Sequence, residues 1–223
     1  MIDTPTHDHD TESASRFTYL GGRLAIDLIN TVENWHGPEH AERYDNDKLA
    51  TYADLVDWAE LAGAIPPDHA ATLRQAAAER PDEAAAVMAR ASALRLALHD
   101  VLEATVVGTP PAEADVAVVN AEVAAQLAES TLVWVPKGFH LDRGGTRGPC
   151  LDRPLWPVAR SIVDLLTDPA DLRKVRTCAA DVCGWMFLDT SGGRRRWCSM
   201  ADCGNAEKVR RFRKRQRAAT AHR

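Results

Sequence analysis

Apolar residues recur with the helical period of about 3.6 along most of the first 170 residues. Six segments show this spacing, and they cover residues 23–35, 52–65, 66–80, 81–107, 113–129 and 156–167. Thr51 fits an N-cap for the second segment. In the first segment, Ile26, Ile29 and Val32 leave the start of a strand as an alternative. The pattern predicts a mainly helical bundle.

A different pattern interrupts these helices at residues 131–145. There, β-branched and aromatic side chains flank a Pro-Lys-Gly sequence, which predicts a short β-hairpin. Residues 1–16 are polar and acidic and are expected to be disordered. They lack the apolar segment of a signal peptide, and no apolar run is long enough to span a bilayer. We therefore expect a cytoplasmic protein without a membrane partner.

The charge is divided unevenly along the chain. Overall composition is that of an average globular protein, with 45% hydrophobic and 26% charged residues and a net charge of -5. Residues 1–170 carry 13 Lys and Arg against 27 Asp and Glu, whereas residues 171–223 carry 14 against 5. A polyanion such as nucleic acid is therefore expected to contact the C-terminal part alone.

Four of the five cysteines form two pairs in the C-terminal part. Cys178 and Cys183 enclose four residues, as do Cys198 and Cys203, and fourteen residues separate the pairs. Four thiolates suit tetrahedral Zn²⁺ and leave no open position for a substrate, which predicts a structural rather than a catalytic zinc ion. An iron–sulfur cluster and a redox dithiol are the alternatives. The odd number of cysteines argues against a disulfide framework.

The residues between the two pairs can enclose such a metal site. Their separation leaves room for a hairpin between Cys183 and Cys198. Trp185, Phe187 and Trp197 are expected to shield the site, and alternation along a strand would place Met186 and Leu188 on the opposite face. About 45 residues can bury little core, so metal binding is expected to supply part of the folding free energy.

A strongly basic helix is expected to begin near residues 199–205. Its stripe of Ala206, Val209 and Phe212 is expected to pack on the zinc core. Seven cations on one helix repel each other unless a polyanion compensates them. The candidate nucleic-acid-binding residues, counting those of the preceding loop, are Arg194, Arg195, Arg196, Lys208, Arg210, Arg211, Arg213, Lys214, Arg215 and Arg217.

The expected fold class is therefore α+β. A predominantly helical N-terminal domain with a small β-hairpin precedes a small, treble-clef-like, four-cysteine zinc-binding domain. The expected boundaries are a disordered tail at 1–16, a helical domain at 17–172, the finger with its basic helix at 173–217, and a disordered tail at 218–223. In the helical domain, Asp27, Asn30 and Thr31 are candidates for an effector pocket. Capping or internal hydrogen bonding is the favoured alternative for these three polar residues.

The finger resembles the CGNR zinc-finger proteins, whose N-terminal half is called the ABATE domain. The matching stretches of the finger include Cys183-Gly184-Trp185, Phe187-Leu188-Asp189, Arg195 to Met200 and Cys203-Gly204-Asn205. Looser matches in the front half are Gly22, the LAIDLINTV stretch, Leu55 with Trp58, Leu94 to Leu98, and Ala159-Arg160-Ser161 followed by Asp164-Leu165-Leu166. The family's arginine after Cys-Gly-Asn is replaced here by Ala206. Its task would pass to Lys208 or Arg210, or be lost.

The resemblance implies a bacterial, stress-induced transcription regulator with a sensor-like helical domain. Double-stranded DNA is then the expected partner, and the front domain is expected to bind a small-molecule effector, to form a homodimer, or both. An RNA- or ribosome-associated zinc protein is the alternative. An enzyme with its active site in the front domain is the third hypothesis. We expect no enzymatic activity, because the sequence shows no nucleophile–base pair, phosphate-binding loop or HExxH motif.

Overall fold

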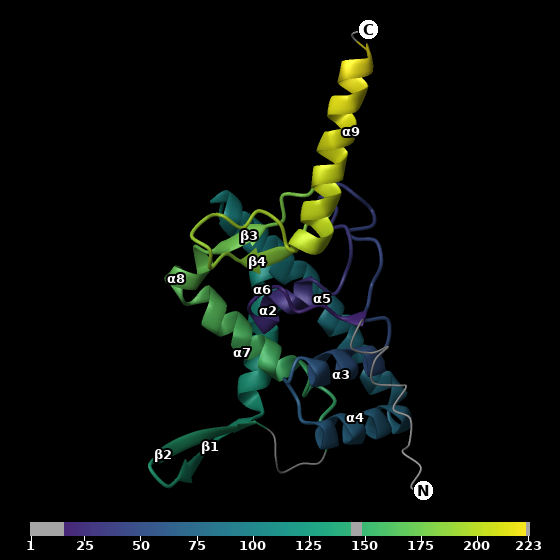
Figure 1. Cartoon of the computed structure of the whole chain (residues 1–223). Helices are drawn as coiled ribbons and strands as arrows, with labels where there is room; N and C mark the ends of the chain where they lie inside the picture. Colours follow the sequence, from purple (N-terminus) through teal and green to yellow (C-terminus); the bar gives the residue numbers. More distant parts are fainter. Residues whose placement is uncertain (1–15, 144–148, 222–223) are drawn as a thin grey trace, which may run out of the picture.

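The computed structural model describes residues 16–143 and 149–221 (Figure 1). Within these residues, seven helices build the N-terminal body in the order α2 (Leu24–Ile29), α3 (Tyr52–Leu61), α4 (Pro67–Glu79), α5 (Pro81–Val107), α6 (Glu113–Ala128), α7 (Leu155–Leu166) and α8 (Pro169–Leu172). The predicted mainly helical domain is thus confirmed. Residues 1–15 of the N-terminal tail and residues 222–223 lie outside the described residues, so their predicted disorder stays a prediction. Residues 218–221, however, belong to a helix.

Local sequence signals account for the ends of several helices. Thr51 and Asp54 form a capping box at the start of α3, each side chain accepting a hydrogen bond from the other residue's backbone N–H. Gly108 ends α5 in the left-handed conformation, with φ of 85°. The long α5 lies at the centre of the body, where Leu94, Leu98 and Leu102 are fully buried.

The first helix is shorter than predicted. The apolar period of residues 23–35 suggested one continuous helix, but α2 ends at Ile29. Beyond it, Val32 pairs with Asp47 in an isolated β-bridge, and Trp35 is buried against His99 with ring centroids 3.8 Å apart. Helical spacing predicted that these residues are buried but not their backbone conformation, because β-branched residues also suit extended chain.

Two antiparallel hairpins are present in the described chain. The predicted one consists of β1 (Ser130–Val135) and β2 (Gly138–Arg143), and Figure 1 shows that it projects from the body. The second pairs β3 (Val175–Thr177) with β4 (Met186–Leu188). The spacing left room for a hairpin between Cys183 and Cys198, but the hairpin of the finger closes around Cys178 and Cys183 instead.

The chain ends in a basic helix that projects from the body. Helix α9 (Asn205–Ala221) follows a π-helical turn at Met200–Gly204. In Figure 1 it extends away from the body, at the opposite end of the molecule from the β1–β2 hairpin. None of the helices within the described ranges is long and apolar enough to cross a membrane.

Candidate metal centre and basic helix

Four cysteines from three short elements meet at one point. Cys178 directly follows β3 and Cys183 lies in the loop before β4, so the β3–β4 turn supplies the first pair. Cys198 ends the long loop after β4, and Cys203 lies in the π-helical turn that leads into α9. All four sulfur atoms lie within 4.8 Å of one another. The predicted ligands are therefore brought together, and one of them lies beside the start of the basic helix.

The sulfur distances fit a tetrahedral metal site. The Sγ atoms of Cys183 and Cys198 are 3.7 Å apart, and those of Cys198 and Cys203 are 3.5 Å apart. Disulfide sulfurs would lie about 2 Å apart, and all four cysteines are free. Four sulfurs placed about 2.3 Å from a central ion would be separated by roughly 3.8 Å. The arrangement matches a tetrathiolate metal centre.

Hydrogen bonds among the four thiols shift their pKa values in opposite directions. Hydrogen bonds from neighbouring thiols lower the pKa of Cys178 to about 2. The hydrogen bond that Cys183 makes to Cys178 raises the pKa of Cys183 to about 12. The pKa of Cys198 also rises because of its hydrogen bond to Cys178, and burial raises the pKa of Cys203. A divalent metal would hold all four as thiolates, since coordination deprotonates a thiol.

Backbone groups hold the cysteine loop tightly. Gly184 has a φ of 68°, and a Cβ atom there would lie 2.4 Å from the Cβ of Trp35. Only glycine suits both the conformation and the close approach. The backbone N–H of Cys198 donates to the sulfur of Cys178 at 3.3 Å. Phe187 packs with Cys178 and Cys198 in a small cluster of its own.

The shielding residues lie where strand alternation predicts. Phe187 is fully buried beside the cysteines, while Met186 and Leu188 point the other way and join the core of the helical body. Trp185 and Trp197 are partly buried and pack against the cysteine cluster. One strand thus belongs to both cores.

Hydrogen bonds also join the finger to the helical body. The Asn30 side chain donates to the Met186 carbonyl at 2.8 Å and accepts from its N–H at 3.0 Å. The indole N–H of Trp185 donates to the Val32 carbonyl at 2.6 Å. The backbone N–H of Trp35 donates to the Cys183 carbonyl at 3.2 Å. These bonds fix the metal centre on the body, so the finger is not a separately tethered module.

The three polar residues considered for an effector pocket make internal hydrogen bonds instead. Besides the bonds of Asn30, the Thr31 hydroxyl donates to the Leu28 carbonyl and accepts from Arg95. Asp27 accepts the N–H of Gly21 at 2.7 Å. Asn30 and Thr31 are 2% exposed. Asp27 reaches the edge of a separate hollow of about 360 Å³. These contacts favour the structural interpretation, and the three residues do not form one pocket.

The predicted nucleic-acid-binding residues divide into three groups. Arg195 turns inward: it donates to the carbonyls of Trp197, Leu20 and Cys198 at 3.2, 3.0 and 2.7 Å, and its guanidinium lies 4.0 Å from the Phe187 ring centroid. We correct its assignment to a structural one. Arg210 pairs with Asp181 and Glu207, and Arg211 with Glu207. The other seven are exposed, and they are Arg194, Arg196, Lys208, Arg213, Lys214, Arg215 and Arg217.

The apolar stripe of α9 does not pack on the metal core. Val209 is 47% exposed and Phe212 is 56% exposed. The prediction that they anchor the helix is wrong, because α9 projects away from the body and these side chains therefore do not contact it. The helix is instead held at its base, where Glu207 is buried and Ser199 caps the preceding π-helical turn.

One face of α9 gathers several of the cations. Lys208, Arg211, Lys214 and Arg215 line a shallow hollow on this helix. Lys208, Arg213, Lys214, Arg215 and Arg217 form no ion pair with any residue that the structure describes. A projecting helix with unpaired cations is suited to contact an extended anion.

Sequence patterns gave no indication of the buried arginine of the body. Arg95 lies on the apolar α5 and its side chain is 1% exposed. It pairs with Asp47 and donates to Thr31 and Tyr44 at 3.0 Å each. Its partners lie in loops distant in sequence, so only the tertiary structure shows the network.

Two family models match the chain. Residues 22–169 match ABATE, described as "Putative stress-induced transcription regulator". Residues 174–216 match the CGNR zinc finger. No match was found among curated proteins. The first match covers the body from α2 to α7, and the second begins just before β3 and ends within α9.

Proposed function

Because the chain belongs to the ABATE family and carries a CGNR zinc finger, we propose that it is a zinc-dependent, DNA-binding transcription regulator. The observation that carries this proposal is the projecting helix α9, most of whose cations form no ion pair with described residues and whose base adjoins the metal centre. Its 17 residues span roughly 25 Å, enough to follow one face of a DNA groove. The proposal assigns no catalytic step to the chain.

We infer that the metal is Zn²⁺ and that its role is structural. Four thiolates are the donor set of structural zinc sites, and none of the four positions is left for a substrate. Cys178, Cys183, Cys198 and Cys203 would hold the ion. In that arrangement the metal joins the β3–β4 turn to the base of α9, and so orients the basic helix relative to the body. Stress-induced expression, a bacterial source and a cytoplasmic location follow from the family description and the sequence as expectations.

Binding of the zinc-loaded full chain to duplex DNA tests the proposed function. Fluorescence anisotropy across a salt series should show a log–log slope of about -5 if six cations contact phosphates. The variant Lys208→Gln/Lys214→Gln/Arg215→Gln removes three cations of one face of α9 that form no ion pair with described residues, so it should reduce that slope by about 3 units and leave the unfolding free energy unchanged. The matched control, Arg74→Gln/Arg80→Gln/Arg153→Gln on the body, should leave the slope as it is. An unchanged slope in the α9 variant would contradict the proposal.

RNA is the alternative partner, and the same assay separates the two polymers. Recognition of single-stranded RNA uses exposed aromatic side chains for stacking. In the finger, Phe187 is fully buried and Trp185 and Trp197 are partly buried, so Phe212 of α9, 56% exposed, is the one aromatic side chain among its described residues that is free to stack on a base. A single exposed aromatic side chain among many cations favours DNA. Tighter binding to single-stranded RNA than to duplex DNA at matched salt would replace the DNA proposal.

We further propose that the β1–β2 hairpin pairs with a second copy of the chain. Its side chains Leu132, Trp134 and Phe139 are 67%, 67% and 69% exposed. An isolated two-stranded hairpin is only marginally stable in water, and both of its edges can pair with another strand. A dimer would present two α9 helices to two half-sites. Sedimentation equilibrium should show a dimer that Trp134→Ser/Phe139→Ser weakens; a monomeric wild-type chain would exclude it.

A further inference from the structure

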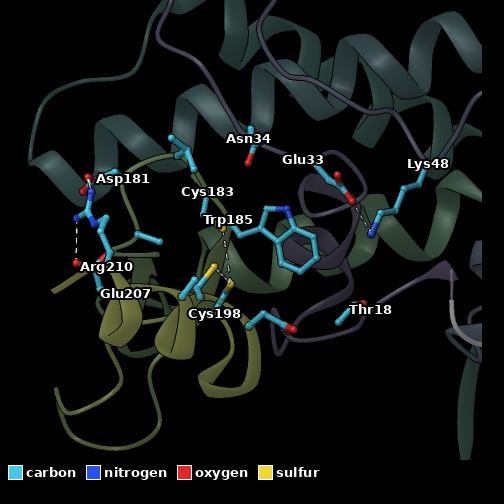
Figure 2. A pocket seen from close by; sticks show the side chains of 15 residues that line it. Thr18, Glu33, Asn34, Lys48, Asp181, Cys183, Trp185, Cys198, Glu207 and Arg210 are labelled. Carbon is cyan, nitrogen blue, oxygen red and sulfur yellow. Dashed lines mark hydrogen bonds and ion pairs between the residues drawn. The ribbon is translucent and has the colours of Figure 1, made fainter. Parts of the chain in front are cut away.

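A cavity of about 660 Å³ lies where the helical body meets the finger (Figure 2). Glu33, Asn34 and Lys48 of the body line one side, and Asp181, Trp185 and Arg210 of the finger line another. This volume falls in the range of small-molecule sites and is far larger than a single metal ion requires. Three of the four cysteines also border it, so the metal centre forms part of its wall.

An aromatic wall already holds a cation in this cavity. Figure 2 shows the Trp185 ring between the cysteines and the ion pair of Glu33 with Lys48. The Lys48 ammonium lies 5.5 Å from the Trp185 ring centroid and 3.5 Å from the Glu33 carboxylate. An indole face and a carboxylate together form a recognised arrangement for binding ammonium groups. Lys48 thus shows that this ring accepts a cation, and a ligand ammonium would displace the Lys48 ammonium from it.

The charge of the lining also favours a cation. Four carboxylates line the cavity, from Glu33, Asp181, Asp202 and Glu207, against the two cations of Lys48 and Arg210. Both cations are already paired, Lys48 with Glu33 and Arg210 with Asp181 and Glu207. Asp202 forms no ion pair within the described part of the chain. A tetrathiolate centre stays net negative with a divalent metal bound, which adds to the same field.

Ala206 keeps the cavity open at the base of α9. It lies on the lining and is exposed. A longer side chain at this position would enter the cavity, and an arginine would also neutralise its charge. Arg210, one helical turn further on, lines the same cavity but its guanidinium is held by two carboxylates. The small residue therefore leaves both the space and the negative potential available.

We propose that this cavity binds an organic ammonium ion, with the ammonium group against Trp185 and the carboxylates around it. Binding of the ammonium ion to the cavity does not depend on whether α9 binds DNA. The role of the ammonium ion as the effector of the regulator rests on the proposed function. The cavity is suited to that role because its lining joins the body to the first turns of α9, through Ala206 and Arg210. A ligand that competes for Asp181 or Glu207 would loosen Arg210 and alter how α9 is held.

Isothermal titration calorimetry on the zinc-loaded full chain tests the binding. Choline is the probe, dimethylbutanol is its uncharged isostere, and benzoate is the anionic comparison. We expect choline to bind at least about tenfold more tightly than dimethylbutanol, because only the charged probe gains the cation–π and carboxylate interactions. Benzoate should not bind. Equal affinity for choline and dimethylbutanol, preference for benzoate, or no binding of choline at millimolar concentration would each overturn the proposal.

Variants of the lining locate the site. Ala206→Leu should abolish choline binding by filling the space, and because Ala206 is exposed the variant should fold. Glu33→Gln should weaken choline by about tenfold through loss of a carboxylate. The matched control is Glu42→Gln, an exposed residue of the same loop region that does not line the cavity, and it should leave the affinity unchanged. Choline binding that survives Ala206→Leu would overturn this location.

Anisotropy with duplex DNA, with and without saturating choline, separates the two proposals. A change in DNA affinity in the wild-type chain that is lost in Ala206→Leu supports the effector role. Choline binding in a chain that does not bind DNA would leave the cavity proposal standing and reject the regulator. DNA binding in a chain that does not bind choline would reject the cavity proposal alone.

Discussion

The helical body and the finger are stabilised by different means. The body buries a continuous cluster of apolar side chains from α2 to α7. The finger's own cluster of buried residues consists of Phe187 with Cys178 and Cys198. The strands of the finger add few apolar side chains to this cluster, because Met186 and Leu188 belong to the core of the body. The comparison indicates that β3 and β4 are held by the body, whereas the later loop and the base of α9 depend on the metal.

The two regions also use their cations differently. In the body, Arg90 binds Glu122 and Asp152, and Arg95 binds Asp47. The cations of Arg90 and Arg95 are held in ion pairs with these carboxylates and therefore have a structural role. On α9, cations such as Lys214 and Arg215 form no ion pair with described residues. Charge that does not stabilise the fold is available for a partner, which is why we place the DNA contact on α9 rather than on the body.

Metal removal should have the largest effect, and it should affect one region only. Chelation of zinc, or Cys198→Ser, should unfold the loop after β4 and the base of α9, since structural zinc supplies on the order of 10 kcal/mol in such units. Hydrogen exchange followed by mass spectrometry should show protection lost beyond residue 189. Residues 186–188 and the body should stay protected, because Met186 and Leu188 pack in the core of the body.

A cysteine outside the cluster provides the control for that experiment. Cys150 is free and partly buried, and it does not belong to the metal-binding group. Cys150→Ser should retain full zinc content and the wild-type exchange pattern. Full zinc content in Cys198→Ser would show that the ligand assignment is wrong. Loss of protection throughout the body after chelation would break the distinction between the two regions.

Removing the buried arginine should destabilise the body by about 3–5 kcal/mol. Arg95→Met leaves Asp47 without its cation and leaves Thr31 and Tyr44 without a shared donor. Urea unfolding measures the loss. The control is Arg213→Met on α9, an exposed side chain without an ion pair among the described residues, and it should change the unfolding free energy by less than about 0.5 kcal/mol. Similar losses of unfolding free energy in Arg95→Met and Arg213→Met would contradict the conclusion that cations stabilise the body but not α9.

Arg195 should behave like an arginine of the body although it lies in the finger. Arg195→Gln removes donors to four backbone carbonyls and the contact with the Phe187 ring, and it should cost about 2–3 kcal/mol. Its neighbour Arg194 is exposed, so Arg194→Gln is the control and should cost little. A strong effect of Arg195→Gln on the salt slope for DNA, without loss of stability, would return Arg195 to the nucleic-acid-binding group.

Sequence patterns predicted those parts of the structure that neighbouring residues in the chain determine. The helical period, the Thr51 N-cap and the cysteine spacing identified α3 to α7 and the four cysteines that cluster. They failed where a distant contact decides the outcome. Helix α2 is short because the chain beyond Ile29 pairs with residue 47 and with the finger.

The same reason explains the misassigned site residues. Arg195 has the chemistry of a phosphate contact, and only the positions of Leu20 and Phe187 show that it points inward. Val209 and Phe212 have helical spacing, but spacing gives no information on whether a surface faces them. The cavity beside Trp185 joins Glu33 and Lys48 to residues about 150 positions later, a distance over which no sequence pattern extends.

Replacing the buried carboxylate of Asp27 should have the smallest effect on the unfolding free energy, and this effect should depend most strongly on pH. Burial raises the pKa of Asp27 from 3.8 to about 6, although the hydrogen bond from Gly21 opposes the shift. Between about pH 4 and pH 6 the folded chain therefore binds more protons at Asp27 than the unfolded chain does, so this contribution to stability falls as pH rises. Asp27→Asn can still accept the Gly21 N–H and cannot ionise.

We therefore expect Asp27→Asn to gain roughly 1–3 kcal/mol over the wild type at pH 7, and much less near pH 4. Urea unfolding of both chains across this range measures the difference. Asp68→Asn on the exposed start of α4 is the control, and its difference from the wild type should stay nearly constant. A constant difference for Asp27→Asn as well would mean that the carboxylate is ionised without penalty. Water or a cation would then reach Asp27 through the hollow beside it.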